Sequence, residues 1–214
     1  YLPGPPIDND NIEKILGLVN GKKSRLKNKI LKSNGIVSRH YAIDENQQTK
    51  ISNSEMAAKA GLACIADSFI PLSKIQMLSC ATTQGDLVLP GFGSMVQSEM
   101  NLSGVELHTS HGICSSSMMA LKTAFTSIKA ECNDNALVIA SELSSRLFKH
   151  TRYEQLASDE TDFNAEFLRW MLSDGAGAML LESKPRGQKS LRIDWIRSFS
   201  HADAFPVCMS IGHA

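Results

Sequence analysis

Uninterrupted apolar runs separated by helical patterns are the feature that most restricts the fold of this chain. Residues 136–141 read Ala-Leu-Val-Ile-Ala-Ser, and residues 176–181 form a second run of this kind. A strand with one face in water alternates apolar and polar residues, whereas a strand covered on both faces is apolar throughout. Because helical patterns lie between the runs, we predict a layered α/β domain with a mainly parallel sheet.

Five strands and four helices are predicted in all. The helix that begins after Ser52 has the clearest signals, because Glu55 completes a capping box and Pro71 ends the apolar pattern. Apolar residues at helical spacing predict another helix after Ser117. Asp10, followed by Glu13, is the predicted N-cap of a short helix at 11–16 that Gly17 ends, and another helix is predicted at about 94–102. The strands are predicted at 75–81, 105–109, 136–141, 176–181 and 191–195, the last with one face in water.

The balance of charge excludes several classes of protein. The 214 residues include 22 basic and 22 acidic side chains, so no overall field attracts nucleic acid or an anionic membrane. No apolar stretch approaches the ~18 residues of a membrane span, and residues 1–4 lack the basic start of a signal peptide. The five cysteines form no CxxC pair, which favours free thiols in a reducing compartment. We therefore predict a cytoplasmic protein.

Cys114 is the candidate catalytic residue, because it lies where a predicted strand is followed by a predicted helix. Unpaired backbone N–H groups and the helix dipole favour an anion at a helix N-terminus, and thiols placed there ionise more easily than ordinary ones. Small residues at 112 and 115–117 leave space for a substrate carbonyl, and backbone N–H groups at the turn could stabilise an oxyanion. The alternative is a buried core thiol. The other four cysteines are predicted to be structural: Cys64, Cys80, Cys132 and Cys208.

Metal and dinucleotide sites are not predicted. His108, His111 and Cys114 recur at every third residue, but a strand followed by a turn would not bring the three side chains together, and no fourth ligand has familiar spacing. His111 is instead predicted to be a loop residue beside the site. Gly175-Ala176-Gly177 precedes a strand and lacks the third glycine of a phosphate-binding loop.

A basic run lies near the start of the chain and leaves two interpretations open. Neutral net charge makes this local excess conspicuous. The run is either a solvated helix face or a docking patch for an acidic partner. Its members are Lys22, Lys23, Arg25, Lys27, Lys29 and Lys32.

Five landmarks in a fixed order resemble the N-terminal half of thiolase-fold condensing enzymes, and of the type III β-ketoacyl-acyl-carrier-protein synthases in particular. The resemblance extends over nearly all 214 residues and implies the layered α-β-α thiolase fold, with a five-stranded mixed sheet in this half. The landmarks are Tyr1-Leu2-Pro3 with an early helix, 35–40 (Gly-Ile-Val-Ser-Arg-His), Ala81-Thr82-Thr83 followed by Pro90, the Cys114 turn, and 173–178 (Ser-Asp-Gly-Ala-Gly-Ala).

The resemblance implies thioester chemistry. The cysteine matched by Cys114 takes an acyl group, and a malonyl-type or β-ketoacyl thioester then supplies a carbanion that forms a carbon–carbon bond. The expected substrates are acyl thioesters of coenzyme A or acyl carrier protein, and no other cofactor is expected. The enzyme is expected to be a homodimer. Lys22, Lys23, Arg25 and Lys27 become the expected docking residues for the carrier protein. Residues 1–214 are expected to form a half-domain that lacks the family's first strand and its C-terminal half. The catalytic His and Asn belong to that missing half, so residues 1–214 are expected to be inactive alone.

Departures from the family pattern affect the expected substrate. Lys29 and Ser33 occupy the positions of the Trp and Arg that clamp the adenine of coenzyme A in acetyl-priming members, and neither stacks on a purine as that pair does. Ser116 replaces a glycine, and Leu89 replaces an aromatic residue that crosses the dimer interface. With His111, these two residues are the expected substrate-binding positions. The departures favour longer or carrier-bound acyl chains in a fatty-acid or polyketide-like pathway, and the opening residues are similar to those of enzymes that make dialkylresorcinol-type rings.

Two other functions stay open at the level of sequence. The chain could be a catalytically inactive pseudo-synthase subunit that supports a partner condensing enzyme, although the retained cysteine argues against it. It could also be a cysteine hydrolase, which would need a base near Cys114 and would release a free acid.

Overall fold

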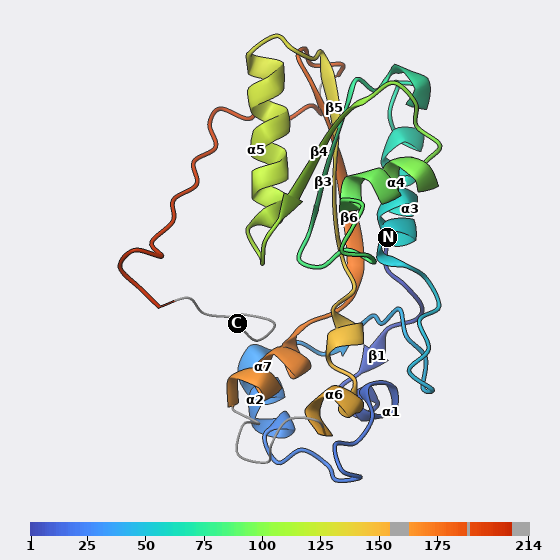
Figure 1. Ribbon diagram of the computed structural model, residues 1–214, viewed down its shortest axis with the longest axis vertical. Coiled ribbons are helices and arrows are strands. Elements are labelled where there is room, and N and C mark those ends of the chain that lie inside the picture. Colours follow the sequence, from blue (N-terminus) through green and yellow to red (C-terminus); the bar gives the residue numbers. More distant parts are fainter. Residues whose placement is uncertain (155–162, 188, 207–214) are drawn as a thin grey trace.

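A computed structural model of the chain describes residues 1–154, 163–187 and 189–206. Within these residues a sheet flanked by helices forms one part of the molecule, and a cluster of short helices forms the other (Figure 1). The helices are α1 (Ile12–Leu16), α2 (Lys27–Asn34), α3 (Asn53–Ala66), α4 (Phe92–Glu99), α5 (Ser116–Lys129), α6 (His150–Glu154) and α7 (Phe163–Met171), and Leu72–Lys74 and Ser144–Leu147 are 3-10 turns. The strands are β1 (Ile7–Asp8), β2 (Ser38–Arg39), β3 (Met77–Thr82), β4 (Glu106–His111), β5 (Asn135–Glu142) and β6 (Gly175–Glu182).

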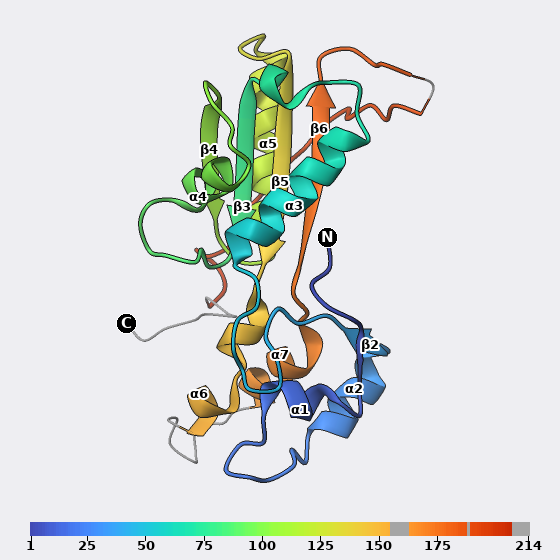
Figure 2. The same cartoon turned by 90° about the vertical axis from the view of Figure 1, so that its right-hand side faces the viewer.

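The main sheet has the order β4-β3-β5-β6, with β3 parallel to β4 and β5, and with β6 antiparallel to β5. Figure 2 shows α3 crossing one face of the sheet and α5 lying behind the other, while α4 joins α3 on its face. Every residue of β3 is buried because helices cover both of its faces. The predicted layered α-β-α arrangement is confirmed.

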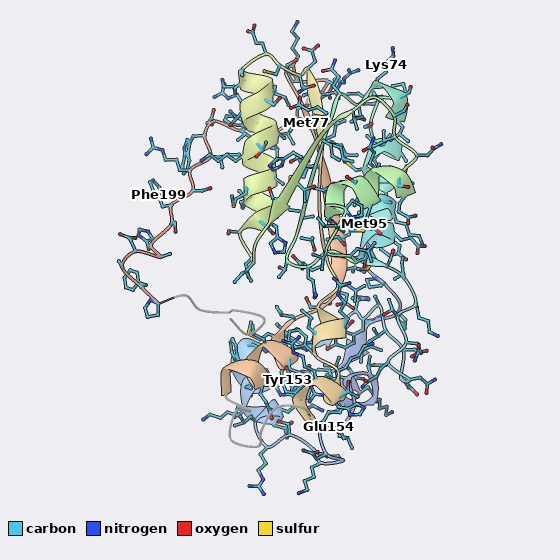
Figure 3. All side chains as sticks on the ribbon, in the orientation of Figure 1. Lys74, Met77, Met95, Tyr153, Glu154 and Phe199 are labelled. Carbon is cyan, nitrogen blue, oxygen red and sulfur yellow. The ribbon has the colours of Figure 1, made fainter. Side chains whose placement is uncertain are left out.

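The predicted fifth strand at 191–195 is wrong. This segment has no regular secondary structure and no strand partner in the described part of the chain. Ile193 and Ile196 pack against the apolar cluster between α5 and the sheet, whereas Leu191 and Trp195 are exposed. Alternation alone does not make a strand when no neighbouring strand offers backbone partners. Further along the same segment, Phe199 points away from the sheet (Figure 3).

Local capping explains where the helices begin. The Ser52 hydroxyl accepts a hydrogen bond from the Glu55 amide at 3.1 Å, which confirms the predicted start of α3. At α1 the prediction of Asp10 as the cap is wrong, because the carboxylate of Asp8 accepts the amides of residues 10 and 11 instead. Gly17 ends α1 as predicted, with a φ of 78°.

Close packing joins α3 to the sheet. A Cβ added to Gly61 would lie 2.6 Å from Cδ1 of Ile139 and 3.0 Å from Cε of Met100. The helix can approach β5 so closely because glycine has no side chain at this position. Within the described residues no helix is long and apolar enough to cross a membrane.

The helical cluster of α1, α2, α6 and α7 has its own apolar core around Trp170. The buried Arg169 guanidinium lies over the rings of Tyr153 and Trp170, at 5.0 and 4.7 Å from their centroids. It also donates hydrogen bonds to the carbonyls of Leu16, Gly17 and Phe148. Tyr153 is labelled among these helices in Figure 3.

Asp174 connects the helical cluster to the sheet. Its buried carboxylate accepts hydrogen bonds from the amide of Ala42 (2.7 Å), from the amide of Ser145 (2.8 Å) and from the Ser145 hydroxyl (2.5 Å). Burial raises the pKa of this carboxyl, and the hydrogen bonds oppose that effect. The 173–178 motif therefore joins three segments that are far apart in the sequence.

Candidate functional site

The candidate site lies at the edge of the sheet where the parallel strands end. Thr82 and His111 are the last paired residues of β3 and β4. The loop after β3 and the turn after β4 therefore leave the sheet side by side. Figure 1 shows that this edge faces the helical cluster.

Cys114 lies in the turn between β4 and α5 and is exposed, so it is not a buried core thiol. The α5 helix begins two residues later, after Ser115, whose side chain makes no capping hydrogen bond. Within the turn, the amide of Ser116 donates to the carbonyl of Ile113 at 3.0 Å. A helix N-terminus without a side-chain cap keeps backbone N–H groups available to an anion. The geometry thus agrees with the predicted nucleophile, whose role stays a prediction.

The remaining cysteines differ from one another. Burial raises the pKa of the Cys80 thiol to about 12, and it also raises the pKa of the half-buried Cys64. Both agree with a structural role. The prediction for Cys132 is wrong, because this thiol is exposed in the turn after α5. Cys208 lies outside the described residues.

The two histidines near the turn have separate environments. His111 is the last residue of β4 and is exposed, so the prediction of a loop position is wrong. Nδ1 of His108 lies 3.1 Å from the hydroxyl of Ser79, which donates to the carbonyl of Ala120. Burial lowers the pKa of His108, and the charge of Glu106 partly opposes the shift. Among the described residues no group of three or more candidate ligands could bind a metal ion.

Ser116 and Leu89 also lie apart. Ser116 is buried as the first residue of α5, beneath the turn that carries Cys114. Leu89 is 80% exposed in the loop after β3, next to Leu87 and Val88, which are also exposed. In the described chain Leu89 therefore contacts solvent, and its substrate-binding role stays a prediction.

Three charged residues that sequence reasoning missed hold the loop after β3. The Glu142 carboxylate accepts hydrogen bonds from the amide and the hydroxyl of Thr83, at 2.7 and 2.9 Å. Burial raises the pKa of Glu142, and the hydrogen bonds from Thr83 oppose the shift. Arg146 pairs with Asp86 at 3.1 Å. The only sequence signal for this network is a polar pair, Ser141-Glu142, directly after a buried strand.

The basic run is divided by the fold. Lys22, Lys23 and Arg25 are exposed ahead of α2 and are available to a partner. The prediction for Lys27 as a docking residue is wrong, because its ammonium is buried in an ion pair with Glu13 at 3.0 Å. It also lies 5.9 Å from the centroid of the buried Trp170 ring. The other two lysines of the run, Lys29 and Lys32, are exposed on α2.

An open groove of about 850 Å³ lies elsewhere on the molecule. It runs between the C-terminal half of α5, strand β6 and residues 190–194. Leu121, Phe125 and Ile128 line it from α5. Cys114 precedes the opposite end of that helix, so the groove is separate from the candidate site.

A family model described as 3-oxoacyl-[acyl-carrier-protein] synthase III matches residues 110–198, which include the Cys114 turn, α5, β5 and β6. This part of the chain is similar to the type III β-ketoacyl-acyl-carrier-protein synthases. Beta-ketoacyl-[acyl-carrier-protein] synthase III of Neisseria gonorrhoeae is 28% identical to it over 187 residues, which are 87% of this chain and 51% of that protein. The enzyme of the same name from Cereibacter sphaeroides is 29% identical over 182 residues, covering 85% of this chain and 49% of that protein.

Solved structures share the fold of this chain. The tetronic acid condensing enzyme AbyA1 superposes with a TM-score of 0.70 at 23% identity, covering 86% of this chain and 52% of that one. The 3-oxoacyl-(acyl carrier protein) synthase III of Pseudomonas aeruginosa gives 0.63 at 20% identity, covering 86% and 50%. The chain spans about half the length of the curated relatives that it matches.

Proposed function

We propose that the chain carries the nucleophile of an acyl-transferring condensing enzyme of the β-ketoacyl synthase III type. Cys114 takes an acyl group from a thioester of coenzyme A or acyl carrier protein, and a Claisen condensation then forms a carbon–carbon bond. The observation that supports this most directly is the exposed Cys114 at the strand-to-helix turn, ahead of an N-terminus of α5 that has no side-chain cap.

The proposed chemistry has two steps. First, the Cys114 thiolate attacks the thioester carbonyl, the bond to the carrier sulfur breaks, and the departing carrier thiolate takes up a proton. Second, a malonyl-type donor loses carbon dioxide, its carbanion attacks the acyl group on Cys114, and the Cys114 thiolate is released. The family resemblance assigns the His and Asn of the second step to the part of the relatives that this chain does not match.

Surface residues support a narrower proposal for the substrate and the partners. Lys29 and Ser33 are exposed on α2 and offer no aromatic platform for an adenine. We therefore infer a longer or carrier-bound acyl donor, with a dialkylresorcinol-type product as the narrower proposal. An acidic carrier protein would bind Lys22, Lys23 and Arg25. Among the described strands β4 lies at an edge of the sheet, so its outer backbone groups could pair with a second copy, which supports the proposed homodimer.

The chain offers an internal control for testing Cys114, because Cys132 is a second exposed thiol. We expect iodoacetamide to alkylate Cys114 faster than Cys132 at pH 7, as located by peptide mass spectrometry. In the intact protein as encoded, incubation with octanoyl-CoA should add an octanoyl group to Cys114, and Cys114→Ala should abolish the adduct. Cys132→Ala serves as the matched control and should leave the adduct unchanged.

Other outcomes would contradict the proposal in recognisable ways. Equal alkylation of the two cysteines, with no acyl adduct, would favour a pseudo-synthase subunit. Release of free octanoic acid without condensation would favour a hydrolase. Loading by acetyl-CoA alone would refute the inference of a longer acyl donor.

A further inference from the structure

The segment 18–25, here called the basic loop, presents three cations to solvent. Lys22, Lys23 and Arg25 are exposed, and among the described residues none of them forms an ion pair. Three carboxylates nevertheless contact the loop, one each from α1, α6 and α7. They accept hydrogen bonds from backbone amides and from the Ser24 hydroxyl, so the positive charge of the loop stays available to a partner.

Glu154 of α6 holds the loop at its turn. Its Oε1 accepts a hydrogen bond from the amide of Asn20 at 2.9 Å and lies 3.0 Å from Nδ1 of His150. The hydrogen bonds from His150 and Asn20 lower the pKa of the Glu154 carboxyl, so it is charged at neutral pH. Asn20 and Gly21 have φ values of 50° and 68°, the left-handed conformation that a tight Asn-Gly turn requires. Figure 3 labels Glu154 in the helical cluster.

Two other carboxylates hold the far end of the loop at Ser24. Glu13 accepts a hydrogen bond from the Ser24 amide at 3.1 Å, and Glu166 accepts one from the Ser24 hydroxyl. The same hydroxyl oxygen accepts two backbone amides at the start of α2. Because Glu13 also pairs with the buried Lys27, Glu154 is the anchor that can be removed without breaking a buried ion pair.

We propose that Glu154 is a positioning residue for carrier-protein docking, because it fixes the basic loop in the shape that an acidic partner binds. This inference rests on the proposed function, which assigns the cations of the loop to an acidic carrier protein. Binding to a fixed loop costs little ordering, whereas a loop released from Glu154 must be ordered when the partner binds. The charge of Glu154 acts in the opposite direction, since a carboxylate beside the loop repels an acidic partner.

The test measures acylation of Cys114 in the intact protein as encoded, with two octanoyl donors. One is octanoyl-acyl carrier protein, and the other is S-octanoyl-N-acetylcysteamine, which has the same thioester but neither a carrier nor a phosphate. Glu154→Ala is expected to raise KM for the carrier-bound donor about fivefold, the loss expected when one hydrogen bond is removed. The kcat of acylation and KM for the small donor should change less than about twofold.

Substitution by glutamine separates the hydrogen bond from the charge. Glu154→Gln loses the same charge as Glu154→Ala but keeps an oxygen that can accept the Asn20 amide. Its KM for the carrier-bound donor should therefore stay at or below the wild-type value. Glu99→Ala, at an exposed carboxylate of α4, is the matched control for loss of charge and should change neither donor. The double variant Lys22→Ala, Lys23→Ala should raise KM for the carrier-bound donor more than Glu154→Ala does.

The results separate this inference from the proposed function. If the wild type takes up no octanoyl group from either donor, both are overturned. If the double variant keeps the wild-type KM, docking at the basic loop is overturned together with this inference. If the double variant loses affinity but Glu154→Ala does not, the positioning role alone is overturned. Equal increases in Glu154→Ala and Glu154→Gln, or an equal increase for the small donor, would also overturn it, because the hydrogen bond to Asn20 would not be the cause.

Discussion

Replacing Asp174 by alanine should destabilise the protein through two backbone amides rather than through the lost side chain itself. The carboxylate is the acceptor for the buried amides of Ala42 and Ser145. Each buried N–H group left without an acceptor costs about 1–3 kcal/mol. Removal of a buried charge offsets part of that loss, since burial raises the pKa of this carboxyl. We expect Asp174→Ala to lower the free energy of unfolding by about 2–4 kcal/mol, with Asp174→Asn between it and the wild type.

Urea unfolding followed by circular dichroism measures the change in stability, and hydrogen exchange identifies its cause. Peptides that contain Ala42 and Ser145 should lose more protection in Asp174→Ala than peptides from α5 do. Asp67→Asn, at an exposed carboxylate at the end of α3, is the control and should stay within about 0.5 kcal/mol of the wild type. Unchanged protection at Ala42 and Ser145 would refute the reasoning, even if the variant were less stable.

Two further predictions concern packing and pH. A Cβ at Gly93 would lie 2.7 Å from the Thr109 hydroxyl oxygen and 3.3 Å from the backbone carbonyl oxygen of His108. Gly93→Ala should therefore lower the free energy of unfolding, measured in urea, by about 1–3 kcal/mol, although alanine has the better helix propensity. Gly187→Ala, where nothing lies within 4 Å, should have no effect, and equal losses in the two variants would contradict the packing argument. Burial lowers the pKa of His108 below 6.5, so the unfolded chain binds the proton first as pH falls. The stability contributed by neutral His108 is therefore complete above about pH 6.5 and is lost as pH falls toward the folded-state pKa. Wild-type protein should lose more stability between pH 7 and pH 5 than His108→Gln does, and parallel pH profiles would contradict this assignment.

Local signals in the sequence were sufficient for the parts of the fold that depend on local chemistry. Ser52 and Glu55 marked the start of α3 because a capping box involves residues three apart. The run at 136–141 predicted β5 because burial on both faces requires an unbroken apolar stretch. Cys114 was placed at the start of a helix on the same kind of evidence, and the structure agrees with that placement.

Contacts between distant residues account for the errors. The 191–195 segment alternates like a strand, but a strand also needs a neighbour, and alternation cannot supply one. Lys27 has the same spacing as its exposed neighbours, and only the fold brings Glu13 and Trp170 to it. Arg146 and Asp86 are separated by 60 residues, so no periodicity could have paired them.

The exposure of Cys132 limits how this protein can be handled. Among the cysteines that the structure describes, an electrophile or an oxidant meets two exposed thiols, and only the one at 114 is relevant to the proposed chemistry. A dithiol reductant would also accept acyl groups by thioester exchange and could discharge a loaded enzyme, whereas a phosphine would keep both thiols reduced without competing for the acyl group. Covalent capture of an acyl intermediate is therefore best attempted on a Cys132→Ser background in phosphine buffer.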